Sequence, residues 1–208
     1  MRGTRERLLE AARQVVARDG LEGLTLRAIA RHAGLSHGAP LRHFPSLASL
    51  LAAVAASGFA RLVAMIDGAL TTAEAASRRQ RGRKLAATER IAVAGQAYID
   101  FALAEPGVFA VTFRPERVDV ADPGYQTQGL RSFTQLVDLV RDAQAEGWHP
   151  DQPADELAAV LWAHVHGLAE LRLHGALGGL FDEARIDDLH RTSATLALGP
   201  LDIPDLGD

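Results

Sequence analysis

The chain has 208 residues, of which 48% are hydrophobic, and it carries a net charge of −4 with no cysteine. This composition excludes disulfides, thiolate metal sites, cysteine nucleophiles and wholesale disorder. The longest apolar runs fall short of the roughly 20 residues that a membrane helix needs, and charges interrupt the first ten residues, where a signal peptide would need an apolar core. We therefore expect a cytoplasmic protein that does not enter a membrane.

Alanine and leucine dominate and alternating β-branched residues are rare, so the sequence predicts an all-α fold of about nine helices. The first helix should cover about residues 4–18 and end at Asp19-Gly20. Thr25 is placed to cap a second helix, Gly34 to adopt the left-handed conformation that ends it, and Ser36 to cap a third helix of about two turns. This spacing is typical of a helix-turn-helix, although an ordinary αα-corner shares it.

Charge separates the first 47 residues from the rest. They contain eight arginines and four acidic residues, a net charge of +4, so the remainder carries −8. A basic head with an acidic body is the asymmetry expected when only the head touches phosphate.

Six further helices are predicted after the head. They are expected over 46 to about 70–76, 86–104, a short stretch around 109–113, 125–145, 154–173 and 182–198. Residues 77–84 (SRRQRGRK) are predicted to be a solvated basic loop, with a second phosphate contact as the alternative. Residues 114–124 should form a proline-bearing loop, and the tail 199–208 should be frayed.

Candidate chemistry in the body is sparse. G-x-S-x-G, Walker and G-x-G-x-x-G signatures are absent, so we expect no enzyme and no catalytic residue. His166, Glu170 and His174 recur every four residues on one helical face. They lack the compact spacing of zinc signatures, so we expect polar contacts at a dimer seam, with no metal and no other cofactor.

Aromatic residues of the predicted body form either ordinary core or the walls of a ligand cavity between helices. They are Phe59, Tyr98, Phe101, Phe109, Phe113, Phe133 and Trp162.

Residues 28–44 (AIARHAGLSHGAPLRHF), followed by LASLL, resemble the DNA-binding head of the tetracycline-repressor-like (TetR) family of bacterial regulators. The resemblance covers about residues 4–60. Two patches of the body, YIDF…EP..F from Tyr98 and WAHVHG from Trp162, resemble one subgroup. Its C-terminal domain is named for a tryptophan, a histidine and a glycine on the penultimate helix.

This resemblance implies a homodimer whose two heads occupy successive major grooves of a near-palindromic operator. It implies a head at 1–46 and a body at 47–208 that binds a small-molecule effector and dimerises through about 154–174 and 182–198. His166 would join the aromatic residues at the cavity. The implied DNA-binding residues are Thr25, Arg27, Ser36, His37, Gly38, Ala39, Arg42 and His43.

Two positions depart from the family pattern. Leu41 stands where the family usually has a tyrosine, and Leu47 where it often has a lysine, both of which bind phosphate. Each lost contact should flatten the salt dependence of DNA binding by about one unit of slope. We expect weaker nonspecific affinity unless Arg2, Arg5 or Arg7 compensates.

Together these patterns predict a ligand-responsive transcriptional regulator, most simply a repressor, that binds double-stranded operator DNA. The competing interpretation is an all-helical small-molecule or metal carrier without DNA binding.

Overall fold

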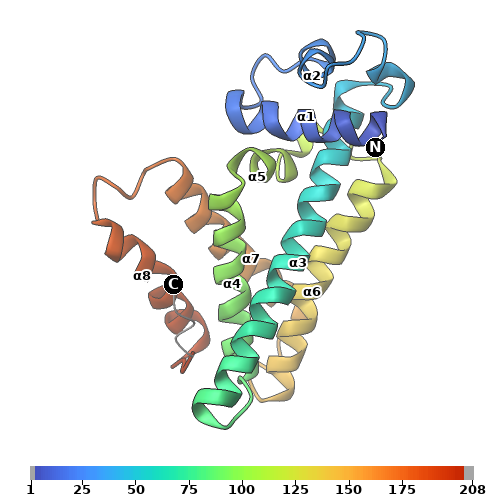
Figure 1. Ribbon diagram of the computed structural model, residues 1–208. Helices are drawn as coiled ribbons and strands as arrows, with labels where there is room; N and C mark the ends of the chain where they lie inside the picture. Colours follow the sequence, from blue (N-terminus) through green and yellow to red (C-terminus); the bar gives the residue numbers. More distant parts are fainter. Residues whose placement is uncertain (1–2, 204–208) are drawn as a thin grey trace. The chain divides into compact units, whose positions relative to one another are not determined.

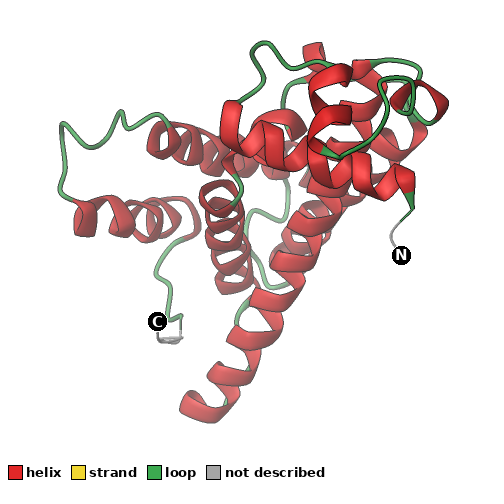
Figure 2. Ribbon diagram, turned by 45° about the horizontal axis from the view of Figure 1, so that its top comes forward, coloured by secondary structure: helices red, strands yellow, loops and turns green. Residues whose placement is uncertain are grey.

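The computed structural model describes residues 3–203, apart from the side chain of Asp187, and over that range it contains helices and loops but no strand (Figure 2). The prediction of an all-α fold is confirmed. The elements are α1 (Thr4–Asp19), α2 (Leu26–His32), the 3-10 helix η1 (Pro40–Arg42), α3 (Leu47–Arg81), α4 (Ala87–Ala104), α5 (Pro106–Thr112), the 3-10 helix η2 (Pro115–Arg117), α6 (Pro123–Ala145), α7 (Ala154–Leu173) and α8 (Glu183–Leu198) (Figure 1). Arg2 and residues 204–208 of the tail lie outside the described residues.

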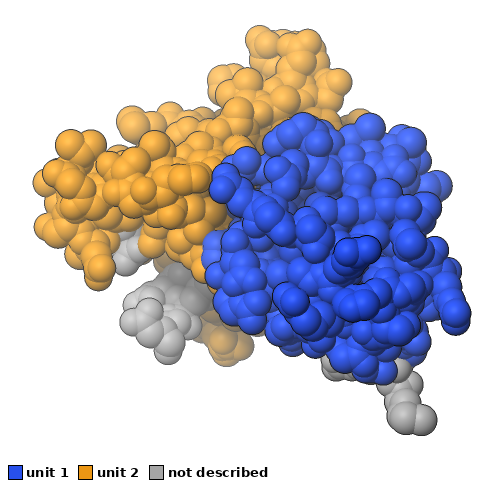
Figure 3. Space-filling view, turned by 90° about the horizontal axis from the view of Figure 1, so that it is seen from above, with its two compact units in different colours: residues 1–61, 105–131 blue, residues 62–104, 132–208 orange. Residues whose placement is uncertain are grey.

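The chain divides into two compact units, coloured separately in Figure 3. The head unit comprises Met1–Arg61 and Glu105–Arg131, and the body unit comprises Leu62–Ala104 and Ser132–Asp208. The long helices α3 and α6 each contribute residues to both units.

The core of the head unit forms because α1, α2 and the start of α3 each present an apolar stripe. Leu8, Ala11, Ala12, Val15 and Val16 recur at helical spacing on α1, and all five are buried. They pack with buried side chains of the neighbouring helices, among them Ile29, Phe44, Leu50, Leu51 and Val54. Full burial of each large side chain contributes roughly 1.5–3 kcal/mol relative to exposure.

Helix α5 packs against α1 at Gly107, within the head unit (Figure 1). A Cβ atom at Gly107 would lie 2.8 Å from the backbone N and Cα of Ala17. Only a residue without a side chain permits so close an approach between two backbones. Pro106 at the first position of α5 begins the helix, since the missing N–H is one that no helical carbonyl would accept.

Helix α3 is longer than the sequence analysis predicted, and the expected loop at 77–84 is wrong for its first five residues. The helix continues to Arg81 and ends at Gly82, whose φ is +66°. Arginine and glutamine are strong helix formers, and no glycine or proline interrupts residues 77–81. The Ser77 hydroxyl, which is buried, donates to the carbonyl oxygen of Arg83 at 3.0 Å.

Within the body unit, α4 packs against both α7 and α8. Eleven residues of α4 are buried, among them Glu89. The Glu89 carboxylate accepts from both terminal nitrogens of Arg83 at 2.8 and 2.7 Å and from the Ala86 N–H at 2.7 Å. Burial tends to raise the pKa of Glu89, but these donors outweigh it and hold that pKa below its ordinary value.

The expectation of a frayed tail is wrong for Asp202 and Ile203, which contact the rest of the body unit. The backbone N–H of Asp202 donates to Glu89 at 3.1 Å, and its carboxylate pairs with Arg81 at 2.9 Å and Arg83 at 3.0 Å. Ile203 packs against a cluster that contains Ala73, Leu85 and Val93. These contacts join positions about 120 residues apart in the chain, which local sequence patterns do not reveal.

Among the described residues, α3 is the one helix long and apolar enough, by length and composition, to cross a membrane. Its most apolar 18-residue window has a mean hydropathy of 1.8, yet 56% of that window is buried inside the protein. Core helices pass the same test.

Candidate nucleic-acid interface

Helix α2 begins at the predicted cap. Thr25 has an extended backbone, and its hydroxyl oxygen accepts a hydrogen bond from the Ala28 N–H at 3.1 Å. That bond satisfies one of the N–H groups that the first helical turn leaves unpaired. Arg27, two residues after the cap, is exposed.

Helix α2 ends in the predicted glycine turn. Gly34 has a φ of +64°, the left-handed region that glycine adopts without steric cost. The Leu35 N–H donates to the Ala30 carbonyl at 2.9 Å and the Gly34 N–H to the Arg31 carbonyl at 3.1 Å, the paired bonds of a Schellman motif. Leu35 then packs against the head core, which fixes where the following segment begins.

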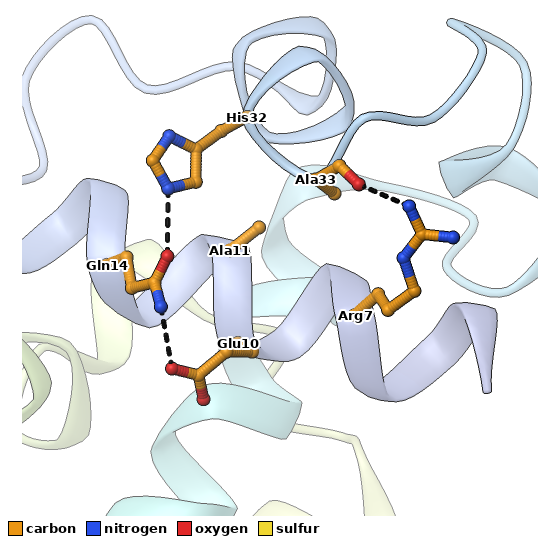
Figure 4. Close-up of a pocket in the computed structure, with 6 residues that line it drawn as sticks. All are labelled: Arg7, Glu10, Ala11, Gln14, His32 and Ala33. Atoms are coloured by element: carbon orange, nitrogen blue, oxygen red, sulfur yellow. Dashed lines mark hydrogen bonds between the residues drawn. The ribbon is translucent and has the colours of Figure 1, made fainter. Parts of the chain in front are cut away.

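Arg7 of α1 closes this turn from outside (Figure 4). One of its terminal nitrogens donates to the Ala33 carbonyl at 2.7 Å and lies 3.4 Å from the Gly34 carbonyl. Charge-assisted bonds of this kind are stronger than neutral ones. The guanidinium therefore fixes the turn to α1, a role that the sequence analysis missed because 26 residues separate the partners.

A chain of side-chain hydrogen bonds also ties α2 to α1 (Figure 4). The Nε2 atom of His32 lies 2.9 Å from the Gln14 amide oxygen, and the Gln14 amide nitrogen donates to Glu10 at 2.9 Å. Glu10 in turn pairs with Arg13 at 2.9 Å. Glu10, Gln14 and His32 line an open hollow of about 140 Å³ between the two helices, together with Arg7, Ala11 and Ala33.

The segment after the turn differs from the prediction of a two-turn helix over residues 36–43. Residues 37–39 form a turn and Pro40–Arg42 form the 3-10 helix η1. An α-helix capped at Ser36 would need its first bond from the N–H of residue 40, and Pro40 has no N–H. Instead the Ala39 N–H donates to the Ser36 carbonyl at 3.0 Å and the His43 N–H to the Pro40 carbonyl at 2.9 Å.

The predicted DNA-binding residues of this segment stand on the surface of the head unit. We call residues 36–43 the reading segment. Its residues Ser36, His37, Gly38, Leu41, Arg42 and His43 are exposed, Ala39 is half-buried and Pro40 is buried. Two buried residues, Pro40 and Phe44, anchor the segment to the head unit. Phe44 is 3% exposed, and the Cζ atom of the Arg5 guanidinium lies 5.2 Å from the centroid of its ring.

The two leucines that replace phosphate-binding residues have different environments. Leu41 is 62% exposed, whereas Leu47 is half-buried and packs against the head core. Packing in the head core therefore explains an apolar residue at position 47, but it does not explain one at position 41.

Three of the four arginines of the basic run at 77–84 form ion pairs within the body unit. Arg78 pairs with Glu74 at 3.2 Å, Arg81 with Asp202, and Arg83 with Glu89 and Asp202. Two further cations of the run, Arg79 and Lys84, are exposed. The alternative of a second phosphate contact here gains no support from this arrangement.

The predicted cavity residues fall into two groups. Phe59, Phe109 and Phe113 belong to the head unit, where the ring centroids of Phe59 and Phe113 lie 5.5 Å apart and those of Phe109 and Phe113 lie 5.0 Å apart. Tyr125, which the sequence analysis did not consider, adds a ring 5.7 Å from Phe59.

The second group lies in the body unit and contains polar atoms. The Nε1–H of Trp162 donates to the Tyr98 hydroxyl at 3.2 Å, and that hydroxyl lies 2.8 Å from Nδ1 of His166. Burial lowers the pKa of His166, against the opposing effect of Glu170, and burial raises the pKa of Tyr98. Indole only donates, so the Tyr98 oxygen accepts from Trp162, and its hydroxyl shares a hydrogen bond with Nδ1 of His166 whose direction depends on the histidine tautomer.

Two further predicted aromatic residues, Phe101 and Phe133, also belong to the body unit. Phe133 lies with its ring centroid 6.4 Å from that of Trp162, and Phe101 is fully buried. Glu170 lies 3.3 Å from Nδ1 of His174 and 3.8 Å from Nε2 of His166. Among the described residues, no three His, Cys, Asp or Glu side chains are grouped so that they could hold a metal ion.

Two family models match the chain. Residues 8–54 match the model described as bacterial regulatory proteins, tetR family, and residues 91–194 match the tetracyclin repressor-like C-terminal domain. No curated protein matches the chain.

Solved structures extend the likeness over nearly the full length. A protein of unknown function from Rhodococcus sp. RHA1 is 34% identical, with a TM-score of 0.78 over 97% of this chain and 96% of that one. A putative tetR family transcription regulator from Shewanella sp. PV-4 is 18% identical, with a TM-score of 0.68 over 95% and 98%. The fatty acid degradation regulator FadR from Bacillus halodurans is 15% identical, with a TM-score of 0.69 over 98% and 99%.

A helix and a glycine turn that present an exposed segment, together with the two matched family models, indicate the class of DNA-binding transcription regulators. The matched models cover residues 8–54 and 91–194, and the C-terminal model alone spans half of the chain. The chain belongs to the tetR family of bacterial regulatory proteins.

Proposed function

We propose that this protein is a ligand-responsive repressor that binds a near-palindromic operator in double-stranded DNA as a homodimer. The observation that carries the proposal is the reading segment itself, which is exposed at six of its eight positions and is fixed at both ends by Gly34 and Phe44. Exposed polar and cationic groups at such a segment suit contacts to base edges and phosphates.

The exposed side chains suggest individual roles. His37 offers a ring nitrogen to a purine edge, and Ser36 offers a hydroxyl to a base or phosphate. Arg27 and Arg42 are placed to contact phosphate, while Gly38 and Ala39 allow a close approach. His43 is exposed, which favours a contact with the DNA backbone over packing in the core.

The homodimer would form through α7 and α8. Both helices expose large apolar side chains: Val160 is 68% exposed, Leu171 45% and Leu196 84%. Exposed apolar faces on adjacent helices suit burial against a second copy. We expect Val160→Glu and Leu196→Glu to yield monomers in sedimentation experiments; a native chain that sediments as a monomer would refute this part of the proposal.

The effector would bind in the body, where Tyr98, Trp162 and His166 bring three polar groups together near the Phe133 ring. It acts by binding the DNA-free arrangement of the dimer more tightly than the DNA-bound one. The same Trp162–Gly167 segment supports membership of the subgroup named for tryptophan, histidine and glycine, and the function supports a cytoplasmic location.

The proposal is tested by DNA binding of the full-length protein. We expect a sequence-selective shift of duplexes taken from upstream of its own gene, or selected from a random library, that weakens steeply with salt. Arg42→Gln should weaken the shift, whereas Arg79→Gln in the body should not. A chain that binds all duplexes equally would refute the operator, and a chain that binds none would favour the carrier interpretation, which ligand or metal content of the purified protein would then test.

A further inference from the structure

Leu41 is exposed in a way that the head's own packing does not explain. Among the described residues up to Arg61, Leu41 is the one large apolar residue that is exposed, with 62% of its surface accessible to solvent. Its neighbour Pro40 is buried, and the next two residues, Arg42 and His43, are exposed. An apolar side chain therefore projects from the middle of a polar, cationic segment.

The local backbone keeps Leu41 uncovered. In a 3-10 conformation, residues three apart lie above one another. The position three before Leu41 is Gly38, which has no side chain to cover it. Pro40 is buried, whereas the adjacent Leu41 is exposed.

The fold of the head does not require glycine at position 38. Gly38 is not among the glycines with positive φ, and a Cβ atom added there would meet nothing within 4 Å. The space above Gly38 is therefore open in the free protein. The absence of a side chain at Gly38 would let another molecule approach the backbone closely.

The chemistry of Gly38 and Leu41 together favours one feature of DNA. The major groove offers a single apolar group to a protein, the C5-methyl of thymine. We propose that Leu41 packs against a thymine methyl group in each half-site, with Gly38 giving the base pair room, so that Leu41 is a specificity-determining residue. The inference rests on the proposed DNA-binding function and adds to it the base feature that is read.

The test uses the full-length protein and duplexes selected from a random library. Each thymine in the selected half-site is replaced in turn by deoxyuridine, which lacks only the methyl group. We expect one position at which the replacement weakens binding by the native protein about fourfold, the value of one buried methyl. For Leu41→Ala the same replacement should change affinity by less than about 1.5-fold, because the contact no longer exists.

Two variants serve as controls. Leu130→Ala removes another leucine of the head unit, 68% exposed, and should keep the native response to deoxyuridine. Gly38→Ala should leave the melting temperature unchanged or raised, since the added methyl meets no atom, but should weaken DNA binding by about tenfold.

The outcomes are separable. Selective binding that is unaffected by every deoxyuridine, or that responds equally in Leu41→Ala, overturns the methyl contact but leaves the regulator intact. Native affinity in Gly38→Ala overturns the close approach. If the library yields no preferred sequence, both the proposed function and this inference fail.

Discussion

Two arginine-rich regions of this chain look alike in sequence but use their charges in opposite ways. In the body unit, Arg81 and Arg83 pair with Asp202, and Arg83 also pairs with the buried Glu89. In the head unit, Arg27 and Arg42 are exposed beside the reading segment.

The difference shows that a basic run identifies a nucleic-acid surface only after its acidic partners are counted. Residues 77–84 carry no acidic residue, so the run looks like a phosphate contact in sequence. Its partners come from residues 74, 89 and 202. Ion pairs with these partners compete with phosphate for the same guanidinium groups.

The largest effect is expected at Glu89, on which the body arrangement depends. Glu89→Gln should lower the free energy of unfolding by about 2–3 kcal/mol, because a buried amide cannot replace the carboxylate between Arg83 and the N–H of Ala86. Chemical denaturation measures this. The exposed Glu22→Gln is the matched control and should change little; an equal loss there would show that Glu89 has no special role.

The same residue predicts a pH dependence. The folded state lowers the pKa of Glu89, so its stabilising contribution is complete above the ordinary value of 4.5 and is lost as pH falls through the lower folded pKa. Below about pH 4.5 the free energy of unfolding of the native chain should fall more steeply than that of Glu89→Gln. Parallel curves would contradict this.

Arg7 and Arg42 are expected to have different roles: Arg7 stabilises the head, whereas Arg42 contacts DNA. Arg42→Gln should reduce the slope of log affinity against log salt by about one unit. Arg7→Gln should weaken binding by about tenfold and lower the melting temperature, yet keep the native slope, because its charge is bound to the Ala33 carbonyl. A slope reduced by one unit in Arg7→Gln would identify Arg7 as a phosphate contact instead.

A smaller effect is expected at Thr25. Loss of the cap in Thr25→Ala should cost about 1 kcal/mol of stability, and Thr25→Ser should recover most of it. Thermal unfolding of the three proteins measures both changes. If serine and alanine behave alike, the cap bond contributes nothing.

The smallest effect is expected for the cations of the basic run at 77–84 that form no ion pair among the described residues. Arg79→Gln and Lys84→Gln remove the two exposed cations of the basic run that take no part in the ion pairs described above, and we expect operator affinity and its salt slope to stay at native values. If either substitution reduced the slope of log affinity against log salt, the basic run would be a second DNA contact after all.

Local signals in the sequence predicted much of the fold. Caps and breakers placed the start of α2 at Thr25, its end at Gly34 and the bounds of α7 at 154 and 173, and the structure agrees with these. They worked because each is a property of one or two neighbouring residues. The end of α3 was misjudged because a polar composition was treated as a break, although arginine and glutamine favour helix.

Signals between distant residues were not available from one sequence. Nothing in α1 indicates that Arg7 bonds the carbonyls at 33 and 34, or that Gln14 meets His32. The helix expected over 36–43 failed for a local reason that was present but unweighed, namely Pro40 at the position of its first hydrogen-bond donor. The placement of the candidate DNA-binding side chains on the surface follows from the turn, whereas which bases they meet depends on the DNA.

The hydrogen-bond chain from His32 continues beyond α1, since Arg13 also reaches the Ser57 hydroxyl of α3 at 3.3 Å. Helix α2 has only seven residues, too few to persist alone in water. Contacts with the longer helices α1 and α3 therefore stabilise α2, and we expect the three helices to unfold locally as one unit. In deuterium exchange the amides of α2 should be protected to the same degree as those of α1, and Gln14→Ala should release α2 first.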